Sequence, residues 1–201
     1  RTGGASCATA VFGLTSLTLH NNSQLVMLGE PHEIKEQYSI SKELPSLTTI
    51  ASHVYFCICI ESALFFVVHV IGHKYLYERH KVHHEYTVPH ALTTLHSEPL
   101  DFIIGIGIPF VAGILLLGNR THCIVFMYWG LWRLNQGFSI HCNYDFDWSL
   151  FRIVPLSAGA RYHSFHHSQN VGNYGSFMVL QDTLTNTNHE YYRHIGSRLI
   201  D

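Results

Sequence analysis

Histidine is the residue of this chain whose number and spacing indicate chemistry. The 201 residues include 17 histidines, and these crowd between residues 69 and 96 and again between residues 163 and 167. A buried imidazole needs a partner for each of its two nitrogens, and an exposed one gains nothing from packing. Metal ions would serve a whole cluster as shared partners. The clustered histidines that we predict to bind metal are His69, His73, His80, His83, His84, His163, His166 and His167.

The spacing within the clusters is helical. At about 100° per residue, the five histidines from His69 to His84 fall within an arc of roughly 100°, so we expect one helix to carry them all. His163, His166 and His167 repeat the i, i+3, i+4 pattern on a second helix. So many imidazoles exceed the roughly three or four ligands of one zinc site and suit two ions, each with an open position. Because imidazole binds zinc, copper, iron and nickel, the ligand type leaves the metal open.

The composition indicates a membrane protein. Charged residues make up 13% of the chain, about half of the roughly 25% that is usual in soluble domains, and hydrophobic residues make up 47%. Residues 47–71, 102–118 and 122–140 are apolar runs, and the first can cross a hydrocarbon core of roughly 30 Å. With 12 Lys and Arg against 14 Asp and Glu, the chain lacks the basic surface that a nucleic-acid partner requires.

The second and third apolar runs are joined only by residues 119–121 and must form an antiparallel hairpin. Asp101 and His141 therefore emerge on one side of the membrane, together with both histidine clusters. Lys74, Arg79 and Lys81 lie among the histidines and favour the cytosolic face. We expect an all-α fold of about four membrane-embedded helices in two hairpins, with a cytosolic helical cap that carries the histidines.

The chain is expected to divide into two segments. Residues 1–45 form an N-terminal segment that we interpret as incomplete, because the chain begins with Arg1 and not with methionine. Residues 21–48 are polar and broken by Pro31 and Pro45, so we expect a loop there with at most one short helix. Residues 46–201 form the membrane-embedded domain.

Several stretches resemble a known family. They are His69-x3-His73, HKVHHEY at 80–86, His141-x2-Tyr144 and RYHSFHHSQNVGNYGSF at 161–177. Together they resemble the fatty acid hydroxylase superfamily over roughly residues 60–188, and within it the sterol C4-methyl oxidases. Pro89 occupies the family's proline position, residues 172–177 match its GNYxSxF element, and Asp182 stands where the family has a Trp-Asp pair.

The chain departs from the family pattern at several positions. Val70 replaces the family's arginine after the first histidine. Glu98 falls where an ungapped count places a later family histidine, and His96 lies two positions earlier. The family's HSGYD reads HCNYD at 141–145. These differences leave the substrate open, and also whether His96 or Glu98 binds metal.

The resemblance implies a non-haem di-iron enzyme. It adds His141 to the ligands, so that the predicted set is His69, His73, His80, His83, His84, His141, His163, His166 and His167. Candidates for supporting these ligands, or for replacing one, are Glu61, His96, Glu98, Tyr144, Asp145 and Asn173. Glu61, inside the first apolar run, is expected to contact a ligand imidazole or to pair with another side chain. No catalytic residue beyond the metal ligands is expected.

The implied reaction is oxidation of a C–H bond of a sterol, with C4-methyl oxidation as the first choice. It would use two iron ions, O2 and electrons from NAD(P)H that arrive through cytochrome b5 or its reductase. The implied location is the endoplasmic reticulum membrane, with the histidine clusters of this multi-pass protein facing the cytosol. Alternatives within the superfamily are a fatty acid or sphingolipid hydroxylase, a sterol desaturase and a sterol side-chain de-alkylase. An alternative of another class is a non-catalytic membrane metal-binding protein, which Glu98 would favour.

Overall fold

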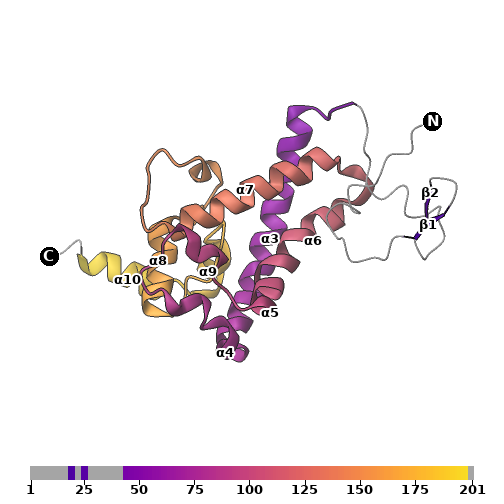
Figure 1. Cartoon of the computed structure of the whole chain (residues 1–201). Helices are drawn as coiled ribbons and strands as arrows, with labels where there is room; N and C mark the ends of the chain where they lie inside the picture. The colour runs from indigo at the N-terminus through magenta and orange to yellow at the C-terminus, as the bar shows by residue number, and fades with distance from the viewer. Residues whose placement is uncertain (1–17, 21–23, 27–42, 199–201) are drawn as a thin grey trace.

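The computed structural model describes residues 18–20, 24–26 and 43–198. These residues are mostly helical, which confirms the predicted fold class (Figure 1). Two short strands, β1 (Thr18–His20) and β2 (Gln24–Val26), pair antiparallel. Residues 24–26 thus form a strand where a loop was predicted, directly after the turn-favouring sequence Asn-Asn-Ser at 21–23. Residues 27–42 of the predicted loop lie outside the described residues.

The structure has two helical stretches that are long and apolar enough to cross a membrane. The first is α3 (Leu47–Tyr75), which begins after Ser46, whose Oγ accepts the backbone N–H of Thr49 at 3.1 Å. Its 29 residues extend for about 43 Å. The second stretch, Pro99–Arg120, consists of α5 (Pro99–Phe102), the π-helical turn η3 (Ile103–Gly107), α6 (Ile108–Leu117) and the turn η4 (Gly118–Arg120).

Helix α6 packs closely along α3. Gly113 permits this approach, because a Cβ at its position would lie 2.8 Å from Cα of Cys57, and small residues let membrane helices meet. The adjacent core holds Trp129 of α7 (Cys123–His141), whose indole N–H donates to the carbonyl of Phe110 at 2.8 Å. Figure 1 shows α7 turning back from the end of α6, so the predicted hairpin is present.

Helix α7 is less apolar than α3 and α6. It carries Arg133, Asn135, Gln136 and His141, and it is not among the stretches that qualify as membrane spans. Within the described part of the chain there are therefore three long helical stretches, where about four membrane-embedded helices were expected. The polar positions of α7 matter for the site, because Arg133, Gln136 and His141 are buried.

The remaining helices are short, and α8, α9 and α10 lie together on one side of α3 (Figure 1). They are α4 (Tyr77–His80), η1 (His83–Glu85), η2 (Ala91–Leu95), η5 (Leu150–Ile153), α8 (Ala160–Gln169), α9 (Leu180–Thr185) and α10 (His189–Arg198). Together they form the histidine-rich helical cap that the sequence predicts.

The prediction of one continuous helix from His69 to His84 is wrong. Helix α3 ends at Tyr75, and Leu76 leaves the helical conformation with φ −122° and ψ 25°. The chain then turns and brings His80 back to His69, with 4.9 Å between the ring centroids. A continuous helix would spread these histidines over about 22 Å, too far for them to surround one ion. The turn at Leu76 is what gathers them.

Candidate metal centre

The nine histidines predicted as ligands lie in two compact groups. The first histidine group consists of His69, His73, His80, His84 and His166. The second histidine group consists of His83, His141, His163 and His167. Within each group, one ring nitrogen from every member lies within 4.8 Å of the others. All are buried except the half-buried His73.

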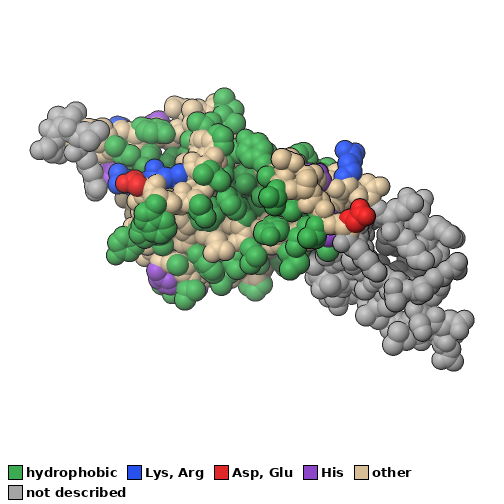
Figure 2. All heavy atoms as spheres, turned by 90° about the horizontal axis from the view of Figure 1, so that it is seen from above, with side chains coloured by type: hydrophobic (Ala, Val, Ile, Leu, Met, Phe, Trp, Pro, Cys, Tyr) green, Lys and Arg blue, Asp and Glu red, His purple; other side chains and the backbone are tan. Residues whose placement is uncertain are grey.

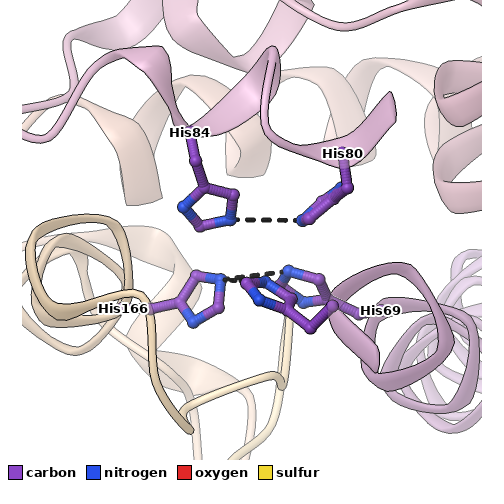
Figure 3. A group of neighbouring side chains, drawn as sticks. His69, His80, His84 and His166 are labelled. Atoms are coloured by element: carbon purple, nitrogen blue, oxygen red, sulfur yellow. Dashed lines mark hydrogen bonds between the residues drawn. The ribbon is translucent and has the colours of Figure 1, made fainter. Parts of the chain in front are cut away.

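The first histidine group is built from α3, α4, η1 and α8, and Figure 3 shows His69, His80, His84 and His166 facing one another. Nε2 of His166 lies 3.0 Å from Nε2 of His69 and 3.1 Å from Nε2 of His73. Nε2 of His84 lies 3.2 Å from Nε2 of His80. Five imidazoles thus direct nitrogens toward a common centre.

The second histidine group combines η1, α7 and α8. Nε2 of His141, at the end of α7, lies 3.3 Å from Nε2 of His83 and 3.0 Å from Nε2 of His163. His167 completes the group, with its ring centroid 4.7 Å from that of His83. Because η1 and α8 each supply histidines to both groups, the two groups are neighbours within one centre.

The outer nitrogens of most of these nine histidines are held by acceptors. In five of them, Nδ1 donates a hydrogen bond to a backbone carbonyl. The pairs are His69 with Tyr174 (2.8 Å), His83 with His96 (3.1 Å), His141 with Gly137 (2.8 Å), His166 with Gly172 (2.6 Å) and His167 with Tyr86 (3.1 Å). A carbonyl can only accept, so each of these rings carries its proton on Nδ1. Nε2 is then an unprotonated donor atom directed inward, as metal-binding histidines require.

One nitrogen tests directly whether a metal fits. Nε2 of His167 is buried and has no hydrogen-bond partner among the described residues, although such atoms are rarely left unpaired. A cation in the second histidine group would supply the missing partner. The donor set, all imidazole nitrogen, suits zinc, copper, iron or nickel.

Five histidines of the cap have lowered pKa values. Burial, followed by the neighbouring imidazole of His80, lowers the pKa of His83 to about 4. Burial, followed by His83, lowers the pKa of His167 to about 3. The pKa values of His84, His163 and His166 are also lowered, first by burial and then by adjacent histidines. Near neutral pH these rings are uncharged and competent to bind a cation without first releasing a proton.

Glu61 has partners other than an imidazole. Its buried carboxylate accepts from Nε of Arg133 at 2.8 Å and from Oγ of Ser176 at 3.4 Å. Gln136 extends this network by donating to the carbonyl of Ser176 at 3.1 Å. The structure therefore favours the pairing alternative, in which Glu61 ties α3 to α7 and to the loop before α9.

The other supporting candidates lie outside the two groups. The imidazole of His96 is 2.8 Å from Glu85, and only the backbone carbonyl of His96 reaches a ligand. Glu98 caps α5 and pairs with Arg79 at 3.0 Å. Both His96 and Glu98 thus belong to the scaffold that surrounds the two histidine groups.

Tyr144, Asp145 and Asn173 are likewise not members of either group. Tyr144 is exposed, and Asp145 pairs with Arg152 at 3.1 Å. Asn173 is buried, with φ 53°, and its Nδ2 donates to the carbonyl of Tyr162 at 2.9 Å. It thereby shapes the turn between the two residues, Gly172 and Tyr174, whose carbonyls hold ligands.

Two aspartates that support the centre are absent from the predicted set. Asp101 accepts from Nδ1 of His80 at 3.0 Å. Asp182 is fully buried and accepts the backbone N–H groups of Tyr174 at 2.9 Å and Gly175 at 2.7 Å, so it fixes the carbonyl that holds His69. The family likeness at Asp182 was a usable signal, whereas nothing in the local sequence links Asp101 to His80.

A cavity lies against both groups. Its wall includes His69 and His80 from the first group and His83, His141 and His163 from the second. Apolar side chains, among them Phe65, Val68, Ile104, Ile106 and Ile140, line the rest of it. The space inside is about 40 Å³, room for a few water molecules. A larger molecule would enter only by displacing part of this wall.

Comparison with known proteins gives a consistent result. The chain is 36% identical over 155 residues to methylsterol monooxygenase 2-2 of Arabidopsis thaliana, an alignment that covers 75% of this chain and 57% of that protein. It is 30% identical over 176 residues to methylsterol monooxygenase 1 of Danio rerio, covering 85% and 60%. A very-long-chain aldehyde decarbonylase of Oryza sativa subsp. indica is 35% identical over 153 residues, covering 74% and 56%.

The chain thus spans somewhat more than half the length of these relatives. No solved structure matches it. The family model for fatty acid hydroxylase matches residues 54–187, which include all nine histidines of the two groups. The chain belongs to the fatty acid hydroxylase family.

Proposed function

We propose that this chain forms the metal-binding core of a membrane di-iron oxygenase that oxidises a C–H bond of a sterol, with a C4-methyl group as the first choice. The observation that carries the proposal is the pair of inward-facing histidine groups with fixed tautomers. The relatives named methylsterol monooxygenase support the choice of substrate.

Iron is the metal that fits this proposal. The donors are imidazole nitrogens, and imidazole accommodates iron. Zinc binds the same ligands but has no redox chemistry. The iron pair, when bound, would supply the activation of O2, and the electrons would come from NAD(P)H through cytochrome b5 or its reductase.

The chain's own residues hold and shield this centre. The carbonyls of Tyr174, His96 and Gly137 orient ligand imidazoles. The carboxylate of Asp101 does the same for His80. The apolar cavity wall, supplied largely by α3, η3 and α7, limits the access of water to the reacting carbon.

The membrane setting agrees with a lipid substrate. A sterol dissolves in the bilayer, and the cavity lies beside the two membrane spans, where Phe65 and Ile104 line it. Lys74, Arg79 and Lys81 lie where α3 ends and the cap begins, which favours a cytosolic cap. The location in the endoplasmic reticulum membrane is proposed from the family resemblance alone.

The test is metal analysis joined to a product assay. The full chain, purified in lipid with a reductant and O2, is expected to hold about two irons and to oxidise a 4-methyl sterol only when both co-substrates are present. His83→Ala should abolish the activity, whereas His189→Ala, in an exposed residue of α10, should leave it unchanged. Stoichiometric zinc with no redox signal would favour a non-catalytic metal-binding protein instead.

The decarbonylase relative favours one alternative substrate. Its name specifies a very-long-chain aldehyde, and it is 35% identical to this chain, against 36% for methylsterol monooxygenase 2-2 of Arabidopsis thaliana. The same preparation should therefore be offered a long-chain aldehyde in parallel. If the protein converts the aldehyde and not the sterol, the substrate is a long-chain aldehyde, and the proposed metal centre remains as described.

A further inference from the structure

The loop between α7 and α8, residues 142–159, exposes far more apolar surface than a loop usually does. Trp148 is 78% exposed, Leu150 70% and Ile153 71%. Tyr144, Phe146 and Leu156 are also exposed. Loops facing water are mostly polar, and a contiguous apolar patch of this kind marks a surface that another phase or molecule covers. We call it the aromatic loop.

The rings of this loop are ordered against one another and do not turn inward. Tyr144 stacks on Phe146 with 6.2 Å between centroids and 22° between planes, and Phe146 stacks on Trp148 with 4.8 Å and 29°. The three side chains thus form one apolar projection that begins three residues after the ligand His141.

The aromatic loop continues an apolar face of α7. Met127, Tyr128, Leu131 and Leu134 are exposed along this helix, and α7 itself packs on the membrane span α6, where Phe126 meets Phe110 at 5.6 Å. A groove between α7 and the loop is lined by Tyr128, Leu131 and Trp132 on one side and by Phe146, Trp148 and Phe151 on the other. Figure 2 shows hydrophobic side chains spread over the face seen from above.

The aromatic loop carries few charged side chains, and these lie close to one another. Arg152 pairs with Asp145 at 3.1 Å and with Asp147 at 3.6 Å, and residues 142–159 contain no other cation or anion. One cation against two anions leaves the loop with a single net negative charge, so it has no net positive charge with which to attract anionic lipid. Aromatic rings combined with a few polar groups are typical of the boundary between lipid and water.

We propose that the aromatic loop inserts into the interface of a zwitterionic bilayer without spanning it. The apolar surface is continuous from α6 through α7 to Trp148, so the bilayer that surrounds α6 extends without a break to the loop. Lipid is therefore what covers the exposed rings. The insertion holds His141 and the second histidine group directly beside the headgroup layer. This insertion requires that the two helical stretches identified above span the membrane, and it does not depend on the identity of the substrate.

Fluorescence of Trp148 tests the insertion. The full chain is reconstituted in phosphatidylcholine nanodiscs with and without bromine on the upper acyl chain. The fluorescence of Trp148 is obtained by subtracting the spectrum of the Trp148→Phe variant from that of the unaltered protein. The subtraction removes the contributions of Trp129 and Trp132. Bromolipid is expected to quench most of this difference signal, and aqueous iodide to quench little of it.

A reference position calibrates the measurement. Tyr192→Trp, made in the Trp148→Phe background, places an indole on the polar helix α10, where iodide should quench and bromolipid should not. If Trp148 behaves like this reference, the loop faces water and the proposal fails. If neither quencher reaches Trp148, a protein surface covers the loop, and counting the chains per disc identifies a second copy. Either result overturns the insertion and leaves the proposed catalytic function intact.

Discussion

The two histidine groups support their ligands in different ways. The first has five members, of which His73 is half-buried and His80 is backed by the carboxylate of Asp101. The second has four buried members, of which His83, His141 and His167 are backed by neutral backbone carbonyls. A carboxylate makes an imidazole a stronger ligand than a carbonyl does. We therefore expect the first group to bind its ion more tightly and the second to be the more easily depleted.

The largest effect is expected from His163→Ala, which leaves the second group with three donors. Iron should fall from about two to about one per chain, and activity should drop by more than about 100-fold. His73→Ala is the matched variant, because it leaves the first group with four donors and should cost much less iron. The iron content of both purified variants is measured and compared. An equal loss of iron in His163→Ala and His73→Ala would contradict the expected difference between the two groups.

A smaller loss is expected from Asp182→Asn, which acts through the backbone. An amide offers one acceptor oxygen where the carboxylate holds two N–H groups, so the Tyr174 carbonyl that orients His69 should shift. The metal affinity of the first group should fall by roughly 10- to 100-fold, while that of the second is retained. Competition with a chelator measures both affinities. Asp147→Asn, on a fully exposed residue, is the control.

Asp101→Asn should have a milder effect, because the amide still accepts the N–H of His80 but no longer carries a charge. We expect a loss of about tenfold in the metal affinity of the first group. The spectroscopic signature of one iron should change while that of the other stays constant. A change of equal size in both signatures would show that the two groups are not separable.

The smallest effect is a dependence of stability on pH in the metal-free protein. Burial keeps the pKa of His83 at about 4 and that of His167 at about 3, whereas an unfolded histidine has a pKa near 6.5. The unfolded chain therefore binds more protons as the pH falls below about 6.5, and the folded state loses stability until the pH reaches about 3. Melting temperatures of the chelated protein should decrease over this window. His83→Gln should flatten the curve, and an unchanged slope would argue against the depressed pKa values.

The sequence was most informative where spacing alone identifies a chemical group. The nine predicted histidines all fall in the two groups. Spacing predicted eight of them, six of which lie in two HxxHH triplets, whereas the isolated His141 was predicted only from the family resemblance. Helical geometry could not reveal the turn at Leu76, which depends on contacts made by distant residues. Asp101 reaches His80 across 21 positions, and the carbonyls that hold His69 and His166 have no side-chain signature. Glu61 was recognised as unusual, but its partner Arg133 lies 72 positions away.

The separation of the ligands along the chain has a consequence for biosynthesis. His69 and His166 face each other although 97 positions separate them, and α8 contributes to both groups. A nascent chain that has emerged only as far as α7 holds neither complete set, so an iron pair can be captured only after α8 has been synthesised. A ribosome-bound chain stopped before residue 160 should accordingly retain no iron pair, even with α3 and the stretch Pro99–Arg120 already in the membrane.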